Sequence, residues 1–427
     1  MKSYFVKKST LKGEIVSPSS KSQTMRAILF ASIASGQSKI KNFLKTDDIL
    51  AFIDGCKKFG AKIKVKKNNL EILGTNKKIK LKKNVILDVK NSGIALRFLT
   101  AIYALGDKNI LVTGDESICS MRSMKPLITS LNELGAKITS KKMQGFAPLD
   151  IKGPFKGGSI KIDAKDSQHI SSLLIAASLL KDPMKIEAIN PKEKPWVALT
   201  LEWLDKLNIK YENYNFEKYV LYPAKKIAAF EYLVPTDFST ILFPIVASLI
   251  TKSEISIKDV VFDVFQKDQK TIEIFQKLGA KIEIDKVKQE IRVKKSHLQG
   301  NLDLDVDDFI DSVPILAVFG CFNDGKIVLK NAQNAKTKES NRLSTITVEL
   351  KKMGAKIKET KDGLEIEKSI LKPAIVNSHK DHRIALSLVI ASLGTDGTPC
   401  VIEDIDCISK TYPNFKKDFQ TLKAKVL

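Results

Sequence analysis

Apolar and polar positions along the chain alternate in blocks, and the pattern is clearest between residues 85 and 153. Short apolar runs rich in β-branched residues predict strands, longer runs with apolar positions at helical spacing predict helices, and a closing pair of short alternating stretches predicts two more strands. The segments are, in order, "VILDV" (85–89), "SGIALRFLTAIYAL" (92–105), "NILVTG" (109–114), "MKPLITSLNELG" (124–135), "AKITS" (136–140) and "PLDIKG" (148–153). The block therefore reads βαβαββ.

One phrase recurs at the end of the second helix of such blocks. It reads "KKFGAKIKV", "NELGAKITS", "QKLGAKIEI" and "KKMGAKIKE", with glycine at positions 60, 135, 279 and 354. The gaps between these glycines are 75, 144 and 75 residues, and the middle gap contains a degenerate copy, "DKLNIKYEN", with Asn208 in place of glycine. The chain ends on another, "QTLKAKVL". Glycine after the last helical residue suits a left-handed C-cap, and six repeats of roughly 71–75 residues indicate one repeated supersecondary unit.

The six repeats divide into two halves. The sixth repeat stops at Leu427 without a final strand, whereas "SYFVKK" and "GEIV" read as strands before the first helix. We therefore expect the N-terminal strands to complete the sixth repeat, which gives domains at 18–230 and at 231–427 plus 1–17. The chain would cross between them twice, with a hinge near 17–20 and 226–230. The predicted fold class is α/β (α+β), with three βαβαββ repeats in each domain.

Composition narrows the classes of function. Of 427 residues, 71 are Lys or Arg and 48 are Asp or Glu, so the net charge of +23 favours an anionic partner. Five scattered cysteines without a CxxC pattern, and only four histidines, argue against disulfides and a metal site. No apolar run is long enough for a membrane span, and the N-terminus does not resemble a secretion signal. A cytoplasmic protein without a membrane partner is expected.

Cations cluster near the predicted starts of helices, where the backbone dipole disfavours positive charge. Ser, Asp and Asn at such places are ordinary caps, but added Lys and Arg would convert the exposed N–H groups into a trap for a multiply charged anion. We expect the helix starts of both halves to face one cleft that binds such a ligand. The cations are Lys21, Arg26, Arg97, Arg122, Lys338, Arg342, Arg383 and Lys410.

Other phosphate-binding and covalent schemes fit less well. "SPSSKS" (17–22) has the Lys-Ser pair of a P-loop without its glycines, and no GxGxxG follows a predicted strand. A nucleophilic Ser or Cys needs a histidine partner, and only His382 lies in a candidate site. Cys119, in the loop "GDESICSMRS", remains a candidate nucleophile.

Several of these segments together resemble the motifs of the enolpyruvyl transferase family, and within it the EPSP synthases. The matching segments span the whole chain: "SKSQTMR" (20–26), "NSGIALR" (91–97), "MRSM" (121–124), "DSQ" (166–168), "KESNR" (338–342), "DHR" (381–383) and "SKTYPNF" (409–415). The resemblance implies a two-domain inside-out α/β barrel of six βαβαββ repeats, which agrees with the repeat count.

The resemblance also implies a reaction. The enolpyruvyl group of phosphoenolpyruvate (PEP) would pass to the 5-hydroxyl of shikimate 3-phosphate, with release of phosphate and without a metal or organic cofactor, in aromatic amino acid (chorismate) biosynthesis. The implied catalytic residues are Lys21, which touches both substrates, Asp311, which takes the 5-hydroxyl proton, and Glu339, which acts at the PEP methylene carbon. The implied shikimate 3-phosphate site consists of Lys21, Ser22, Arg26, Ser167, Gln168, Trp196, Asp311, Asn334 and Lys338. The implied PEP site consists of Lys21, Gly93, Arg122, Gln168, Arg342, Arg383 and Lys410.

Two acidic residues depart from the family pattern. Asp166 stands where the family usually has a phosphate-binding Ser, and Glu193 falls near another such Ser. A carboxylate there would repel phosphate unless a cation such as Lys165 or Lys194 compensates.

Three further departures concern neutral positions. Trp196 replaces the usual Tyr, Ile94 the usual Thr, and Ser123 the usual Pro. Because Ile94 would displace the helix that carries Gly93, we expect weakened binding of glyphosate, the inhibitor of the PEP site.

Two alternatives stay open. UDP-N-acetylglucosamine enolpyruvyl transferase shares the fold and the use of PEP, but its catalytic Cys lies five residues before an Arg, whereas Cys119 lies three before Arg122. A basic nucleic-acid-binding repeat protein would account for the charge but not for the motifs at the helix starts. The favoured reading expects two small-molecule substrates, no nucleic-acid partner and a monomer.

Overall fold

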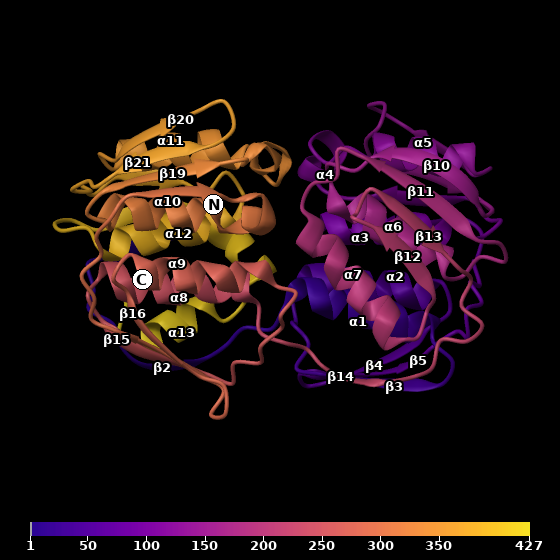
Figure 1. The fold of residues 1–427 in the computed structure, drawn as a ribbon, viewed down its shortest axis with the longest axis horizontal. Coiled ribbons are helices and arrows are strands. Elements are labelled where there is room, and N and C mark those ends of the chain that lie inside the picture. Colours follow the sequence, from indigo (N-terminus) through magenta and orange to yellow (C-terminus); the bar gives the residue numbers. More distant parts are fainter. Residues whose placement is uncertain (1) are drawn as a thin grey trace. The chain divides into compact units, whose positions relative to one another are not determined.

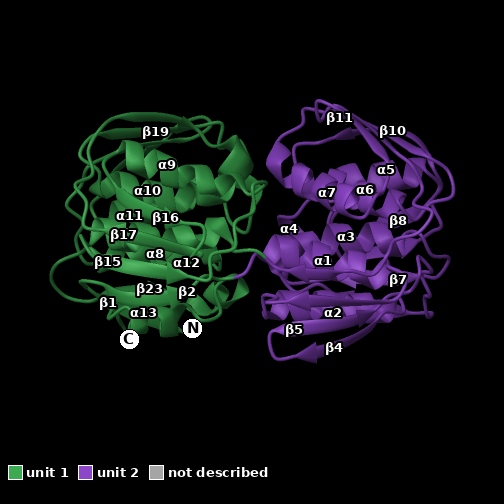
Figure 2. Cartoon of the chain, turned by 60° about the horizontal axis from the view of Figure 1, so that its bottom comes forward, with its two compact units in different colours: residues 1–18, 235–427 green, residues 19–234 purple. Residues whose placement is uncertain are grey.

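Six four-stranded sheets reproduce the repeat read from the sequence. In each sheet the first strand pairs in parallel with the second, and the two closing strands add antiparallel, as in the second repeat, where the order is β6-β7-β9-β8. The computed structural model describes residues 2–427, and the sheets divide between two units (Figure 2). Unit 1 comprises residues 1–18 and 235–427, and unit 2 comprises residues 19–234. The βαβαββ prediction is confirmed.

Unit 2 contains the first three repeats (Figure 1). The first repeat contains β14 (Glu231–Leu233), α1 (Lys21–Ile33), β3 (Gln37–Lys41), α2 (Asp47–Lys58), β4 (Lys62–Lys66) and β5 (Asn69–Leu73). The second contains β6 (Val85–Asp88), α3 (Gly93–Tyr103), β7 (Ile110–Thr113), α4 (Glu116–Ser120), α5 (Lys125–Glu133), β8 (Lys137–Ser140) and β9 (Leu149–Lys152). The third contains β10 (Gly158–Asp163), α6 (Ser167–Ala177), β11 (Met184–Ile189), α7 (Lys194–Lys206), β12 (Tyr211–Tyr214) and β13 (Lys218–Leu221).

Unit 1 contains the other three repeats, in which short 3₁₀ helices (η) precede several α-helices. The fourth repeat contains β2 (Lys12–Val16), α8 (Phe238–Ile250), β15 (Glu254–Lys258), η1 (Lys267–Gln269), α9 (Lys270–Lys277), β16 (Lys281–Asp285) and β17 (Glu290–Lys294). The fifth contains β18 (Leu302–Asp305), η2 (Asp307–Ser312), α10 (Val313–Phe322), β19 (Lys326–Lys330), η3 (Gln333–Thr337), α11 (Arg342–Lys352), β20 (Lys356–Glu359) and β21 (Leu364–Glu367). The sixth contains β22 (Ile375–Asn377), α12 (His382–Leu393), β23 (Cys400–Glu403), η4 (Ile405–Lys410), α13 (Phe415–Thr421), β24 (Lys425–Val426) and β1 (Ser3–Lys7).

Two strands exchange places between repeats, and this corrects the predicted connections. β1 completes the sixth sheet as expected, but β2 pairs in parallel with β15 as the first strand of the fourth sheet. In return β14 pairs with β3 and supplies the first strand of the first sheet. The domain boundary predicted at 230 is therefore early, because the ladder from Glu231 to Leu233 keeps β14 in unit 2 and the division falls between Val234 and Pro235.

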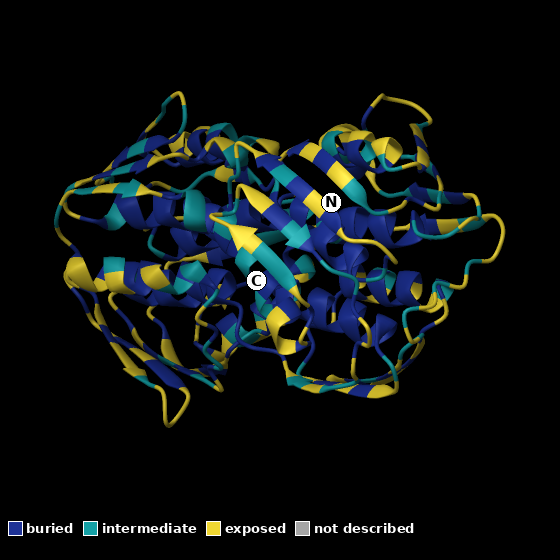
Figure 3. Ribbon diagram, turned by 45° about the vertical axis from the view of Figure 1, so that its right-hand side comes forward, coloured by how far each residue is buried: buried dark blue, intermediate teal, exposed yellow. Residues whose placement is uncertain are grey.

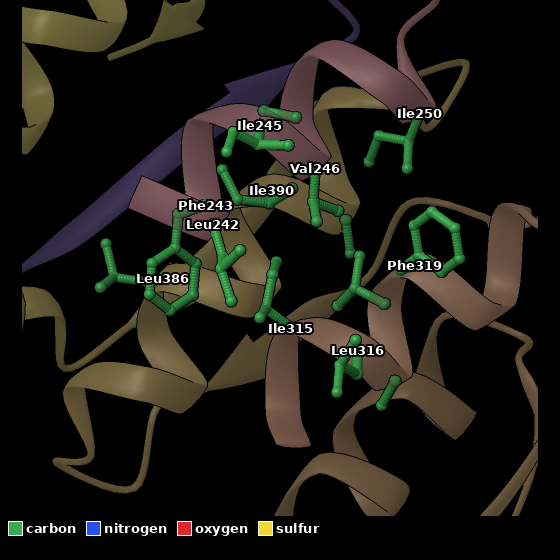
Figure 4. Close-up of a cluster of buried hydrophobic side chains, with 14 of the residues drawn as sticks. Leu242, Phe243, Ile245, Val246, Ile250, Ile315, Leu316, Phe319, Leu386 and Ile390 are labelled. Carbon is green, nitrogen blue, oxygen red and sulfur yellow. The ribbon is translucent and has the colours of Figure 1, made fainter. Parts of the chain in front are cut away.

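The inner helices of each unit are buried on nearly every side, and most of their side chains are apolar, as expected of a helix surrounded by protein. In unit 1, α8 and α12 are buried along their whole length, and α10 along nearly all of it (Figure 3). Side chains of these three helices, among them Phe243, Ile315 and Ile390, pack against one another in the core (Figure 4). The sheets cover this bundle with apolar side chains inward and Lys and Glu outward. Within residues 2–427, none of the helices combines the length and apolar character that a bilayer crossing requires.

The second residue after each outer helix adopts the left-handed conformation predicted from the repeated phrase. Gly60 has φ 117° and Gly135 φ 102°, and Asn208 takes the same role with φ 53°. Lys423, in the last repeat, has φ 67°. Asparagine tolerates this region better than other side chains do, which explains why that repeat could lose its glycine.

Candidate active site

The densest group of charges in unit 1 surrounds Arg342, the first residue of α11. Only 1% of Arg342 is exposed, and each nitrogen of its guanidinium contacts a carboxylate. Nε lies 2.8 Å from Asp381, Nη1 lies 2.6 Å from Asp311, and Nη2 lies 2.6 Å from Glu339. One cation thus holds both of the carboxylates that the sequence assigns to proton transfer.

Asp311 lies near a second guanidinium. Its Oδ2 is 3.5 Å from Nη2 of Arg383, which also donates to the Ser239 hydroxyl at 2.6 Å. Burial opposes ionisation of Asp311, but Arg383, Arg342 and Lys338 outweigh it and hold its pKa below the usual range of an aspartate. Asp311 is therefore a carboxylate at neutral pH, and it becomes a stronger base when anions neutralise those cations.

Asp381 contacts the guanidinium of Arg342 and the backbone of Arg383. It is the N-cap of α12, where its Oδ1 accepts from the backbone N–H of Arg383 at 2.9 Å, while its Oδ2 accepts from Arg342 and from Ser340. No part of the Asp381 side chain is exposed. The sequence identified this residue only as a helix cap.

The remaining predicted residues of unit 1 lie in neighbouring segments. Asn334 is in η3 and Lys338 directly follows it, and η3 contacts both η2 and α11. Lys410 was predicted at the start of a helix, and this is wrong. It is the last residue of η4, α13 begins only at Phe415, and its Nζ lies 3.5 Å from the carbonyl of Lys380, next to Asp381.

In unit 2, cations and an amide gather around Gly93, the first residue of α3. A Cβ added to Gly93 would lie 2.9 Å from Nη1 of Arg97, 3.2 Å from Oε1 of Gln168 and 3.9 Å from Cζ of Arg122. All three side chains therefore converge on the space that glycine leaves. Nη2 of Arg97 also lies 3.1 Å from a carboxylate oxygen of Asp166. Arg97 therefore balances the charge of this acidic residue, a role for which the sequence suggested Lys165 or Lys194.

The first helix contributes a second group in unit 2. Lys21 forms an ion pair with Asp48 of α2, whose side chain is 3% exposed. Nη1 of Arg26 donates to the Ser22 hydroxyl at 2.5 Å, and its Nη2 donates to the carbonyl of Trp196 at 2.9 Å. The sequence analysis missed Asp48, because an Asp in the first turn of a helix already has a local explanation.

Ser167 and Glu193 contact each other. The Ser167 hydroxyl donates to Oε2 of Glu193 at 2.9 Å, and both residues are buried. Asp166 caps α6 by accepting from the backbone N–H of Gln168 at 2.9 Å. Asp166 and Glu193, the two acidic residues that depart from the family pattern, therefore both have partners inside unit 2. The Ser167 hydroxyl could donate to a phosphate only if its hydrogen bond to Glu193 were broken.

Carboxylates of the protein itself balance the charge of clustered cations, although the sequence predicted that a bound ligand would do so. Lys21, Arg97 and Arg342 each face at least one buried or half-buried carboxylate of the same unit. Arg26 and Arg97 lie in the second turn of their helices, and Arg122 lies before α5, as the helix predicted from residue 124 implies. The charge at these sites is therefore close to neutral until an anion displaces a carboxylate.

Three side chains of this region could in principle hold a metal ion. Glu339, Asp381 and His382 offer one ligand atom each, all within 4.8 Å of one another. Both carboxylates, however, already accept from Arg342. A divalent cation would have to displace that guanidinium or be repelled by it.

His169, next to Gln168 in α6, predicts a pH dependence of stability. Burial lowers its pKa from 6.5 to about 4, against the opposing influence of Asp166. Between these two values the unfolded chain binds more protons than the folded one, so the free energy of unfolding falls as the pH falls. The full effect amounts to about 3 kcal/mol. Both tryptophans lie in unit 2, so urea unfolding of that unit at pH 7 and pH 5 can be followed by their fluorescence.

His169→Phe should flatten this dependence, whereas the exposed His297→Gln should retain it. An equal loss of stability on acidification in His169→Phe and in the wild type would contradict the assignment.

Comparisons with known proteins agree on one family. The family model described as EPSP synthase (3-phosphoshikimate 1-carboxyvinyltransferase) matches residues 6–419. The 3-phosphoshikimate 1-carboxyvinyltransferase of Chlamydia abortus is 39% identical over 432 residues and covers 100% of this chain and 95% of its own. That of Acetivibrio thermocellus is 36% identical over 410 residues, with 96% of each chain covered. A solved structure of EPSP synthase from Acinetobacter baumannii matches with a TM-score of 0.82 and 25% identity over 98% of each chain.

Proposed function

The chain belongs to the EPSP synthase family, and from this premise we propose how its residues transfer the enolpyruvyl group of PEP to the 5-hydroxyl of shikimate 3-phosphate. The family uses these two substrates and releases phosphate. The observation that carries the proposal is the position of Asp311, whose carboxylate contacts Arg342 and lies near Arg383. A base beside two anion-binding guanidiniums suits an alcohol that must lose a proton next to a bound phosphoenolpyruvate.

The proposed reaction needs a base and an acid. Asp311 takes the proton of the 5-hydroxyl as that oxygen forms a bond to C2 of PEP, and Glu339 supplies a proton to C3. Glu339 then takes a proton back from C3 of the tetrahedral intermediate, the bond from C2 to the phosphate oxygen breaks with release of phosphate, and the double bond between C2 and C3 returns. Two carboxylates on one guanidinium can serve opposite roles because their environments differ in exposure, 25% for Asp311 and 13% for Glu339.

Substrate binding would raise the proton affinity of Asp311 and Glu339. Each nitrogen of Arg342 already contacts a protein carboxylate, so a PEP anion bound there must displace Asp311 or Glu339. A carboxylate released from a guanidinium gains proton affinity. The base and the acid therefore become competent only after PEP is held, which limits proton transfer in the empty protein.

Unit 2 supplies the other proposed contacts. Because Ser22 accepts a hydrogen bond from Arg26, its own hydroxyl proton can be donated to the phosphate of shikimate 3-phosphate. Gln168 and Arg122 border the space over Gly93, where a small anion such as PEP would fit. Lys21, balanced by Asp48, would exchange that partner for substrate oxygens. We assign Trp196, Ser167, Asn334, Lys338, Arg383 and Lys410 to substrate binding on the motifs they share with the family.

A two-substrate assay tests the function. Release of inorganic phosphate should require PEP and shikimate 3-phosphate together, and Lys21→Ala should abolish it, whereas Lys39→Ala, on the exposed face of β3, should not. UDP-N-acetylglucosamine in place of shikimate 3-phosphate should release none. Alkylation of Cys119 should leave the reaction largely intact. Phosphate release with the nucleotide sugar alone as acceptor would overturn the proposal.

Gly93→Ala should impair PEP binding specifically. The new methyl group would push Arg97 and Gln168 away from the positions they share with Arg122, so we expect the KM for PEP to rise roughly 10-fold, which corresponds to about 1.4 kcal/mol. Gly394→Ala is the matched control, because its methyl group would strike Phe322 in the core of unit 1 and should lower the melting temperature without changing this KM. An unchanged KM in Gly93→Ala would remove Gly93 from the PEP site.

A further inference from the structure

Asp268 is a buried carboxylate that the reaction scheme above does not use. It lies in η1, only 1% of it is exposed, and its Oδ1 accepts a hydrogen bond from the Ser312 hydroxyl at 2.6 Å. Its backbone carbonyl accepts from the Thr271 hydroxyl at 2.5 Å, which ties the segment to the first turn of α9. Burying an ionisable side chain is unfavourable, so its retention here calls for a physical reason.

Ser312 joins Asp268 to the turn that carries Asp311. Ser312 is the N-cap residue of α10, but its side chain makes no capping bond, and its hydroxyl donates to Asp268. A serine cap is worth about 0.5–2 kcal/mol to a helix. Phe309, within the same turn, leaves the helical region at φ −141° and ψ 48°. The bond between Asp268 and Ser312 therefore holds an irregular turn in place rather than the helix end.

Charged groups of the neighbouring elements face Asp268. Asp237 acts on it from the start of α8, Asp311 from η2 and Arg383 from α12. The segment also contacts α9, but the charged side chains at the start of that helix are exposed. Asp268 thus belongs to the same electrostatic group as the proposed base.

The ionisation of Asp268 falls near neutral pH. Burial raises its pKa from 3.8 to about 7, with Asp311 and Asp237 adding to the rise and the Ser312 hydrogen bond and Arg383 opposing it. The proton of Asp268 is therefore gained or lost in the range where the enzyme would work.

We propose that Asp268 is a positioning residue for Asp311: through Ser312 it orients the turn, and by gaining or losing one proton it sets how strongly Asp311 attracts the proton of the substrate hydroxyl. This rests on the proposed function, in which Asp311 takes that proton. An ionised Asp268 adds a negative charge near Asp311 and makes it a stronger base, whereas a protonated Asp268 does not. With both substrates saturating, kcat should therefore rise as Asp268 loses its proton.

Asp268→Asn separates charge from geometry, because the amide oxygen still accepts from Ser312 while the side chain can no longer ionise. We would measure kcat of the wild type and of Asp268→Asn from pH 6 to pH 8.5. The ratio of wild type to variant should be near one at pH 6 and should reach roughly 3–10 at pH 8. Ionisation of the substrates affects both proteins alike and cancels in the ratio. A ratio that is the same at every pH would mean a structural role only and would overturn the proposal.

Variants of Ser312 give a second test, which does not depend on whether Asp268→Asn folds. The Ser312 hydroxyl lowers the pKa of Asp268, so Ser312→Ala should move the inflection in kcat to higher pH. Ser312→Thr keeps the hydroxyl and should leave the inflection near its wild-type position. Inflections at the same pH in both variants would count against the proposal.

Two results distinguish a failure of this inference from a failure of the proposed function. Absence of phosphate release by the wild type at any pH would refute the function, whereas an active wild type with a flat ratio refutes only the role of Asp268. Carboxyl NMR of protein labelled with ¹³C-aspartate reads the residue directly: one carboxyl should titrate near pH 7 in the wild type and be missing from Asp268→Asn. If no such signal disappears, the proposal fails whatever the activity.

Discussion

Asp311→Asn should lower kcat by roughly 10²- to 10⁴-fold, the contribution that a positioned general base makes to a proton transfer. The amide is close in size to the carboxylate and can still accept from Nη1 of Arg342, so the side chains around it should keep their places. What is lost is the ability to take a proton from the substrate hydroxyl. Steady-state release of phosphate at saturating PEP and shikimate 3-phosphate measures this loss.

The KM for PEP distinguishes this mechanism from general damage to the site. Asp311→Asn removes a negative charge that lies 2.6 Å from Arg342 and 3.5 Å from Arg383. Both guanidiniums should then bind an anion at least as tightly as before, so kcat falls while the KM for PEP stays or decreases. Asp308→Asn, in the same 3₁₀ helix but 44% exposed, is the matched control and should retain wild-type values. A kcat within about threefold of the wild type in Asp311→Asn would place the base elsewhere.

The repeat could be derived from the sequence because its signals are local. A glycine after four of the six outer helices and the alternation of strand residues belong to segments of a dozen residues, and the six sheets follow them. The exchange of β2 and β14 could not be derived. Each is a strand of three to five residues, and nothing in so short a segment says which of two sheets its edge will join. The predicted inside-out α/β barrel is confirmed by the likeness to EPSP synthase structures.

The cations of the candidate site were easier to predict than the acids. Arg342 and Arg383 stand out because a positive charge in the first turn of a helix opposes the helix dipole and has no local reason to be there. Asp48, Asp268 and Asp381 do not stand out, since an Asp near a helix start can cap it or interact with its dipole. Only the tertiary contacts bring Asp48 and Asp381 to the cations found by motif, and Asp268 to the residue next to Asp311.

Arg342→Met should have the largest effect on stability. It removes the one cation that Asp381, Asp311 and Glu339 share, and Asp381 is fully buried. Removing one partner of a buried charge group leaves an uncompensated charge and costs about 3–5 kcal/mol. We expect that loss of the free energy of unfolding at pH 7, measured for unit 1 by calorimetry because both tryptophans lie in unit 2. Phosphate release should be abolished.

The pH dependence and a second substitution identify the cause of that loss. Without Arg342 the three carboxylates bind protons more readily in the folded state, so the difference in stability between wild type and Arg342→Met should shrink as the pH falls from 7 to 5. Adding Asp381→Asn should restore part of the stability, because the amide removes one buried charge and can still cap α12 through the backbone N–H of Arg383. Arg342→Lys should fall between wild type and Met, since an ammonium keeps the charge but cannot reach three carboxylates at once. If the double variant were no more stable than Arg342→Met, lost packing rather than unbalanced charge would be the cause, and the guanidinium would not be the centre of this site.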